Sequence, residues 1–350
     1  MRNRLLLVPH GLSANIYVRE LGRAYQKLGI DVSYGADNLT ESNLTPDILH
    51  LQWPEEHYRW TGMGSPEERA KSFLEKLAFL KSKGTQIVWT VHNIAPHEFR
   101  ANALDRHVYQ FVINLADLIV HHCECSKHLL GQTYIVAPDK VQIVCPHGHF
   151  LAYPSGITKA EARRKLGIPE DVFVYLQFGQ VRAYKGISLM LQAFSRLRLH
   201  NKYLLIAGRY AAPQGGANFI ERLRVAFIKR FNTRAHLCLK EVAHEDVQTY
   251  LTAADALVLT HTAGLNSGVA VLGMSFGVPV IAPDMGCLGS VLGKDDNFLY
   301  EPGNLDQLVT AMKNMASENL ADIGQRNRAM AQTWSWDEMA RVILRALESP

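Results

Sequence analysis

The segment 260–283 most constrains the fold of this chain, because one apolar run leads into it and a second apolar run lies at its end. Runs of this kind are typical of strands buried in a parallel sheet. The small residues between the two runs favour a short helix over 268–276. Gly277 then suits the left-handed backbone position that commonly ends a helix. A helix between two buried strands predicts an α/β fold.

Asn266, Ser267 and Gly268 stand at the beginning of this expected helix. Asn and Ser side chains commonly accept hydrogen bonds from the first N–H groups of a helix. Together with the positive end of the helix dipole, those N–H groups attract anions such as phosphates. An ordinary capped helix without a ligand explains the same residues, because an element of a fold does not by itself imply a function.

The length of 350 residues favours two domains rather than one. An alternation of strands and helices begins with the apolar run 5–8 and restarts after a loop near 148–158. We therefore expect two doubly wound, Rossmann-like α/β domains that face a cleft. The first domain is expected to span 1–152 and to be completed by a C-terminal helix in 334–350, and the second is expected to span 153–333.

The composition is typical of a soluble globular protein, with 47% hydrophobic and 20% charged residues. No apolar run approaches the ~18 residues that a membrane-spanning helix needs. The run 5–8 is also too short for the core of a signal peptide. We therefore expect a cytoplasmic protein without a nucleic-acid partner.

Two basic amphipathic helices, expected over 66–83 and 218–231, leave open a peripheral contact with the inner face of the membrane. The net charge of +4 is compatible with an anionic surface or an anionic substrate. Solvated helix faces explain the same residues.

A cluster of metal-ligating residue types occurs at His121, His122, Cys123 and Cys125. The two cysteines lack the second pair that a zinc site of this kind needs. The cluster also follows an apolar run and fits the end of a strand. We therefore predict no metal site in this stretch.

Cationic residues follow two expected strands of the second domain, at the sheet edge where open parallel sheets bind ligands. Arg182 and Lys185 share one turn next to Gly186, and Arg209 follows the next strand. Two cations and a glycine turn suit a diphosphate, through charge neutralisation and close approach of the backbone. A solvated basic loop is the alternative explanation.

Carboxylates and imidazoles follow two expected strands of the first domain. Glu55 comes after one apolar run, and His92, His97 and Glu98 come after the next. These groups are suited to acid/base chemistry. A buried structural histidine explains each His alone, and a surface carboxylate explains Glu55. Together with the cationic turn, they predict transfer from a diphosphate-activated donor.

The chain resembles glycosyltransferases of the two-domain GT-B type, and loosely resembles the large family 4 group over its whole length. The segments 146–148, 182–186 and 277–282 stand where the motifs of that group stand. Family 4 typically places two glutamates ahead of the last motif, with seven residues between them. The corresponding positions hold Gly264 and Leu272, which departs from the donor contacts and retaining chemistry of that group.

A closer resemblance, over most of the chain, is to the xanthan-type β-mannosyltransferases of glycosyltransferase family 94. It rests on the segments 49–55, 90–98, 147–149, 178–186 and 266–268, of which the second and fourth are specific strings. The resemblance implies metal-independent, inverting transfer of mannose from GDP-mannose. It also implies a glycan or polyprenyl-diphosphate-linked acceptor, in the synthesis of an exopolysaccharide or cell-surface glycan.

The same reasoning predicts roles for individual residues. Either Glu55 or Glu98 is expected to be the base that deprotonates the acceptor hydroxyl, and His92 or His97 orients the sugar or the acceptor. Residues of both domains are expected to bind the donor: Gly11, Asn15, Arg182, Lys185, Arg209, Asn266, Ser267, Gly268 and, near the ribose or base, Glu301.

Three other functions remain open from the sequence. One is a retaining, family 4-like transferase that uses a UDP-sugar. Another is a non-catalytic subunit that binds a nucleotide-sugar or a glycan. The third is an epimerase of the same architecture, which needs no second sugar. The sequence does not fix the nucleobase, the donor sugar, the acceptor or the linkage.

Overall fold

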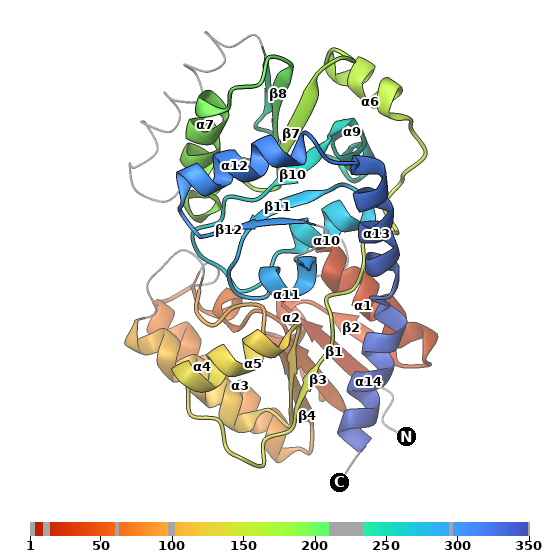
Figure 1. The fold of residues 1–350 in the computed structure, drawn as a ribbon. Coiled ribbons are helices and arrows are strands. Elements are labelled where there is room, and N and C mark those ends of the chain that lie inside the picture. Colours follow the sequence, from red (N-terminus) through yellow and green to blue (C-terminus); the bar gives the residue numbers. More distant parts are fainter. Residues whose placement is uncertain are drawn as a thin grey trace. The chain divides into compact units, whose positions relative to one another are not determined.

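The structure is a computed structural model, and its chain forms two compact units (Figure 1). Unit 1 comprises Met1–Gly148 and Trp334–Pro350, and unit 2 comprises His149–Thr333. The structure describes residues 4–9, 15–59, 63–96, 102–209, 234–293 and 297–348.

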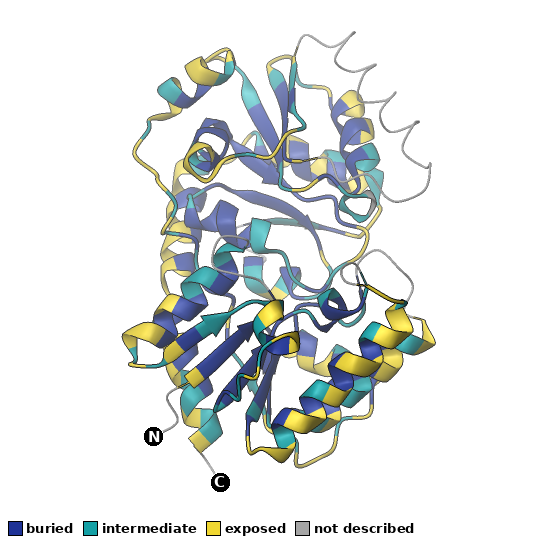
Figure 2. Ribbon diagram, turned by 180° about the vertical axis from the view of Figure 1, so that it is seen from behind, coloured by how far each residue is buried: buried dark blue, intermediate teal, exposed yellow. Residues whose placement is uncertain are grey.

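Unit 1 is built on a parallel sheet with the strand order β2-β1-β3-β4-β5-β6 within the described residues. Its four inner strands are largely apolar and buried (Figure 2), as expected for a parallel sheet covered on both faces, whereas the edge strands β2 and β6 are mostly only partly buried. The strands are β1 (Arg4–Val8), β2 (Asp31–Tyr34), β3 (Ile48–Leu51), β4 (Gln86–Thr90), β5 (Leu118–His121) and β6 (Gln142–Val144). The helices are α1 (Ile16–Lys27), α2 (Ala36–Thr40), the 3-10 helix η1 (Pro54–His57), α3 (Pro66–Ser82), α4 (Ala103–Leu115), α5 (Glu124–Thr133) and α14 (Trp336–Glu348).

The C-terminal helix α14 packs in the core of unit 1, although it is far from the rest of the unit in sequence. Trp336 and Ile343 join the apolar cluster that contains Tyr17 and Leu21 of α1. The Nζ of Lys27 also lies 3.1 Å from a carboxylate oxygen of Asp337. Helix α14 therefore covers the α1 side of this sheet.

Unit 2 contains a second parallel sheet, with the strand order β12-β11-β10-β7-β8-β9 within the described residues. The two sheets confirm the doubly wound α/β class expected from the sequence. The strands are β7 (Phe173–Phe178), β8 (Lys202–Ala207), β9 (Ala235–Cys238), β10 (Ala256–Val258), β11 (Val280–Pro283) and β12 (Phe298–Tyr300). The helices are α6 (Lys159–Leu166), η2 (Ala183–Lys185), α7 (Ile187–Arg196), η3 (His244–Asp246), α9 (Val247–Ala253), α10 (Gly268–Ser275), α11 (Leu288–Leu292), α12 (Leu305–Met315) and α13 (Leu320–Gln332).

The strand order reverses once in each sheet. In unit 1 the reversal lies between β1 and β3, and in unit 2 it lies between β7 and β10. Ligands of open parallel sheets bind beside such a reversal, at the carboxyl ends of the strands. The segments that follow β3, β7 and β10 are therefore the first places to look for a site.

The local prediction for the segment 260–283 is confirmed. Helix α10 begins after Ser267, whose side chain accepts a hydrogen bond from the N–H of Ala270. Gly277 has a φ of 70°, which is the left-handed position after the helix. The helix expected over 218–231 lies outside the described residues.

Gly186 offers a test of how the turn before α7 is held. Its φ is 63°, and a methyl group on its Cα would lie 2.0 Å from the carbonyl oxygen of Thr260. Left-handed backbone costs an alanine about 1–2 kcal/mol, and overpacking costs about 1–3 kcal/mol more. We expect Gly186→Ala to lower the free energy of unfolding by about 2–5 kcal/mol, measured by chemical denaturation.

Gly167 provides the matched control, because its φ is 65° and nothing lies within 4 Å of the added methyl group. Gly167→Ala should show the backbone cost alone, about 1–2 kcal/mol. Equal losses in the two variants would contradict the close approach between Gly186 and Thr260.

Candidate active-site residues

The turn that carries the two predicted cations of unit 2 is fixed to the end of β10. The hydroxyl of Thr260 donates to the carbonyl of Lys185 at 2.6 Å, and the amide of Gln177 donates to the same carbonyl at 3.0 Å. The N–H of Thr262 donates to the carbonyl of Tyr184 at 2.7 Å. Because Thr260 and Gln177 are buried, water competes little for these bonds. The backbone of η2 is therefore held in one place beside the reversal of the sheet.

The ammonium group of Lys185 lies beside the first turn of α10. A methyl group on Gly179 would be 3.2 Å from both the Nζ of Lys185 and the Cγ2 of Val269, so both border the same small space. Burial and, secondarily, the charge of Arg182 lower the pKa of Lys185 to about 8. Lys185 is therefore still mainly protonated at pH 7, in a place where a bound anion would relieve its desolvation.

Ser267 and Gly268 lie at the N-terminal end of α10, as the sequence predicted. Ser267 is the residue before the helix, and Gly268 is its first residue. Asn266 precedes them, and all three residues are partly exposed. The positive end of the α10 dipole thus lies near a partly buried ammonium group, a combination that suits a phosphate-bearing ligand.

Arg182 and Arg209 both border the same turn. The Nε of Arg182 donates to the side chain of Gln180 at 2.9 Å. Arg209 follows β8, and its carbonyl accepts a hydrogen bond from the N–H of Val181 at 2.9 Å. The structure therefore gathers the predicted cations at the carboxyl ends of the neighbouring strands β7 and β8.

Glu301 lies further along the same sheet, after β12, which is two strands away from β10. Its carboxylate accepts a hydrogen bond from the side chain of Asn304 at 3.1 Å, and the residue is exposed. In this structure Glu301 therefore interacts with the start of α12. Its expected contact with a ribose or base stays a prediction.

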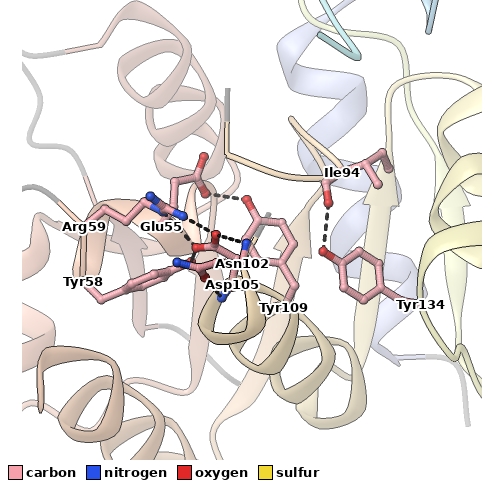
Figure 3. A network of polar contacts seen from close by, with 8 residues as sticks. All are labelled: Glu55, Tyr58, Arg59, Ile94, Asn102, Asp105, Tyr109 and Tyr134. Atoms are coloured by element: carbon pink, nitrogen blue, oxygen red, sulfur yellow. Dashed lines mark hydrogen bonds and ion pairs between the residues drawn. The ribbon is translucent and has the colours of Figure 1, made fainter. Parts of the chain in front are cut away.

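In unit 1, Glu55 lies in η1 shortly after β3, where Pro54 ends the extended chain because it has no N–H for a sheet ladder. Glu55 is only 3% exposed, so the surface-carboxylate interpretation is wrong. Its Oε2 accepts from the hydroxyl of Tyr109 at 2.7 Å (Figure 3), and its Oε1 accepts from the Nδ2 of Asn93 at 3.3 Å.

The pKa of Glu55 is raised to about 7, chiefly by burial, and the hydrogen bonds from Tyr109 and Asn93 act in the opposite direction. Burial favours the neutral acid, whereas donors to the carboxylate favour the charged form. A carboxyl group with a pKa near 7 can accept and return a proton at neutral pH, which suits a general base.

Asp105 anchors the segment that follows η1 to helix α4 (Figure 3). Its carboxylate is fully buried and accepts from the hydroxyl of Tyr58 at 2.7 Å and from the Nε of Arg59 at 2.8 Å. The other oxygen accepts from Arg59 and from the N–H of Asn102. Burial acts to raise the pKa of Asp105, but the bonds from Arg59 and Tyr58 hold it below the usual value. Asp105 is therefore an ionised, structural carboxylate.

His92 follows β4, next to the strand that leads to Glu55. Its Nε2 lies 2.8 Å from the side-chain oxygen of Gln52, and its ring stacks on Trp53 with 4.2 Å between the ring centroids. His92 is buried, so these contacts fix its orientation. The arrangement is compatible with an orienting role.

Tyr17 forms the centre of an aromatic cluster behind these residues. Its ring contacts those of His92, His122 and His147 at centroid distances of 4.8–5.6 Å. Burial lowers the pKa of His122 to about 4 and that of His147 to about 3. These two rings are therefore neutral at pH 7 and support the site by packing.

The remaining predicted residues of unit 1 have separate outcomes. The side chain of Asn15 caps α1 by accepting from the N–H of Tyr17 at 2.9 Å. Gly11, His97 and Glu98 lie outside the described residues, so Glu98 remains an alternative base.

The stretch considered for a metal forms ordinary hydrogen bonds. The two ring nitrogens of His121 lie 2.8 Å from the hydroxyl of Ser126 and 3.1 Å from the side-chain oxygen of Gln142. The Nδ1 of His122 lies 2.8 Å from the carbonyl oxygen of Cys145. Across the described part of the chain, no group of three or more His, Cys, Asp or Glu side chains is arranged to hold a metal ion.

Sequence reasoning missed Tyr109, Asn93 and Asp105 as partners in this site. Asn93 belongs to the distinctive string after β4, which was the available signal. Tyr109 and Asp105 lie inside an ordinary helical pattern. Such a pattern predicts that a side chain is buried, but not which atoms its hydroxyl or carboxylate group contacts.

The chain is similar in sequence to known glycosyltransferases. A GDP-mannose:glycolipid 4-beta-D-mannosyltransferase of Xanthomonas campestris pv. campestris is 27% identical over 293 residues, which cover 80% of this chain and 76% of the relative. A D-inositol 3-phosphate glycosyltransferase of Streptomyces scabiei is 24% identical over 65% of this chain and 53% of its own length. The first similarity confirms the resemblance to β-mannosyltransferases.

Solved structures share the whole architecture. Sucrose-phosphate synthase from Thermosynechococcus elongatus superposes with a TM-score of 0.78 at 18% identity, covering 99% of this chain and 98% of its own. Anabaena HepE in complex with UDP and glucose gives a TM-score of 0.72 at 17% identity over the full length of both chains. These similarities confirm a GT-B fold of two Rossmann-like units.

The family model of glycosyl transferases group 1 matches residues 158–348, which is more than half of the chain. Those residues include the cationic turn and helix α10. The protein is therefore an enzyme, a glycosyltransferase that belongs to the glycosyl transferases group 1 family.

Proposed function

We propose that this glycosyltransferase moves mannose from GDP-mannose to a glycan or glycolipid acceptor, with inversion at the anomeric carbon. The observation that carries the proposal is the similarity, over 80% of this chain, to a relative named for that donor and a glycolipid acceptor. The acceptor class suits a role in the synthesis of an exopolysaccharide or another cell-surface glycan.

In the proposed reaction, Glu55 accepts the proton of an acceptor hydroxyl as that oxygen attacks the anomeric carbon. The bond between mannose and the diphosphate breaks, and GDP leaves with the bonding electrons. Lys185 and Arg182 stabilise the negative charge that develops on the diphosphate, and the N-terminus of α10 adds to this effect. Because protein cations balance the leaving group, the scheme needs no metal ion or other cofactor.

A lipid-linked acceptor would bring the enzyme to the inner face of the membrane as a peripheral protein. No helix in the described segments is long and apolar enough to cross a bilayer. On α3, the ring of Phe79 is 48% exposed, and the ammonium groups of Lys76 and Lys83 lie 5.8 Å and 5.4 Å from its centroid. An exposed aromatic ring between lysines suits the surface of an anionic membrane.

Nucleotide binding tests the proposed donor. A ligand that binds the folded state raises Tm when its concentration exceeds the dissociation constant. We expect GDP, but not UDP, ADP or CMP, to raise Tm, and we expect EDTA to leave that shift unchanged. Transfer from GDP-mannose to a glycolipid acceptor should then give a product whose anomeric coupling in NMR shows inversion.

Other outcomes of this experiment would favour other functions. A shift with UDP alone would discard the mannose donor, and a retained anomeric configuration would discard inversion. Nucleotide binding without turnover on any acceptor would indicate a binding subunit. Conversion of the sugar nucleotide without an acceptor would indicate an epimerase.

Replacing Lys185 tests the diphosphate site. Removing a cation that stabilises developing charge commonly lowers kcat by about 10²–10³, so we expect a loss of that order in Lys185→Ala. In the wild type, the pKa of about 8 also predicts that donor binding weakens as the pH rises through 8, because the ammonium loses its proton. Steady-state kinetics and nucleotide titrations measure both effects.

Lys313 is an exposed lysine on α12 of the same unit and serves as the control. Lys313→Ala should keep both turnover and nucleotide affinity. Wild-type turnover in Lys185→Ala would reject the proposed diphosphate role.

Replacing Glu55 tests the proposed base. Loss of a general base typically lowers the rate by about 10²–10⁴, so Glu55→Gln should lose activity of this order while it still binds the donor. Since the base acts as the carboxylate and its pKa is about 7, wild-type kcat/KM should fall as the pH drops below 7. Glu56→Gln, at the neighbouring position, is the control that should retain activity. Full activity in Glu55→Gln would indicate that Glu98, and not Glu55, is the base.

A further inference from the structure

We propose that Tyr109 is a positioning residue for the catalytic carboxyl group of Glu55, and that it leaves the Oε1 atom to receive the proton from the acceptor. This inference rests on the proposed role of Glu55 as the base. It assigns different tasks to the two carboxylate oxygens, because their hydrogen-bond partners differ in distance and in freedom.

The hydroxyl of Tyr109 is held rigidly against Oε2 of Glu55. Tyr109 is 1% exposed, and its hydroxyl donates to that oxygen at 2.7 Å. Its ring meets the edge of Trp89 at 5.7 Å and stacks with Tyr134 at 5.9 Å between centroids. The hydroxyl of Tyr134 donates in turn to the carbonyl of Ile94 at 3.0 Å (Figure 3). With its ring packed on both sides, Tyr109 cannot swing its hydroxyl away from Glu55.

Helix α4 holds the η1 region at two points that are one helical turn apart. Asp105 binds Tyr58 and Arg59 just after η1, and Tyr109, four residues later on the same face, binds Glu55. This double attachment fixes the direction of the Glu55 side chain relative to the helix.

The other oxygen, Oε1, has the weaker and more adaptable contact. The Nδ2 of Asn93 lies 3.3 Å from it, at the long end of the range for such bonds. The Oδ1 of Asn93 is buried and has no hydrogen-bond partner among the described residues. An acceptor hydroxyl that approaches this side meets two oxygens able to accept its proton or a hydrogen bond, whereas Oε2 is already occupied.

The charged and titratable groups around Glu55 determine the expected pH effect. Burial and the charge of Glu56 raise the pKa of Glu55, and the bonds from Tyr109, from the backbone N–H of Glu55 and from Asn93 lower it. Tyr58 and Tyr134 also face it, while Asp105 and Arg59 neutralise each other. Removing the Tyr109 hydroxyl takes away a donor to the carboxylate form, so the pKa of Glu55 must rise further.

The test is the pH profile of kcat/KM in Tyr109→Phe. We expect its acid limb to move to higher pH by about one unit, the change that follows from losing one good hydrogen bond to a carboxylate. Phenylalanine keeps the ring contacts, and thermal unfolding checks that the variant is folded. Tyr58→Phe is the matched control, because it removes a buried hydroxyl of the same network from Asp105, which Arg59 continues to bind. Its acid limb should stay in place.

A second measurement reads Glu55 without turnover. Infrared difference spectra of each protein against its Glu55→Gln counterpart isolate the carboxyl signal and give its titration midpoint. A midpoint that rises in Tyr109→Phe together with the acid limb supports the proposal. An unchanged midpoint overturns it, whatever the base is. A raised midpoint with an unchanged activity profile overturns the base role of Glu55 and, with it, the catalytic meaning of the contact.

Discussion

The constraint on which both units depend is the burial of their parallel strands. Strands that are covered on both faces consist mainly of apolar side chains, and their polar backbone groups pair with neighbouring strands. Side chains that bind ligands or take part in catalysis therefore lie mainly in the segments that follow the strands. The reversal of strand order then selects one place along each sheet edge, after β3 in unit 1 and after β7 and β10 in unit 2. Glu55 follows β3 and Lys185 follows β7, so both residues lie at these places.

Buried hydrogen bonds fix the groups that the sheet edge presents. In unit 2, Thr260 and Gln177 bind the carbonyl of Lys185, so the turn is held by its backbone while the ammonium remains available to a ligand. In unit 1, Asp105 holds the residues next to Glu55 rather than the carboxyl group itself. In unit 2 the fixed bonds therefore lie one step away from the ammonium group, whereas in unit 1 the Tyr109 hydroxyl also binds one oxygen of Glu55 directly and leaves the longer contact with Asn93 to the other oxygen.

The sequence predicted the fold class, helix α10 and the cationic turn, because short-range patterns determine all three. Ser267 and Gly277, for example, mark the ends of α10 through local backbone geometry alone. The environment of Glu55 could not be predicted, because it depends on contacts between residues that are far apart in the sequence. Its partner Tyr109 is 54 positions away and lies beside it because α4 packs against this part of the unit. The residues next to a glutamate in the sequence therefore do not show whether its side chain is buried or exposed.

The pKa of Glu55 near 7 results from a balance rather than from burial alone. Without its donors, desolvation would push the carboxyl further towards the neutral acid, which cannot act as a base. With stronger donors or a nearby cation, as Asp105 has in Arg59, the carboxylate would be too stable to take a proton. Three neutral donors, the Tyr109 hydroxyl, the backbone N–H of Glu55 and the Asn93 amide, hold Glu55 between these limits. The contrast between two carboxylates joined to one helix thus distinguishes the proposed base from a structural carboxylate.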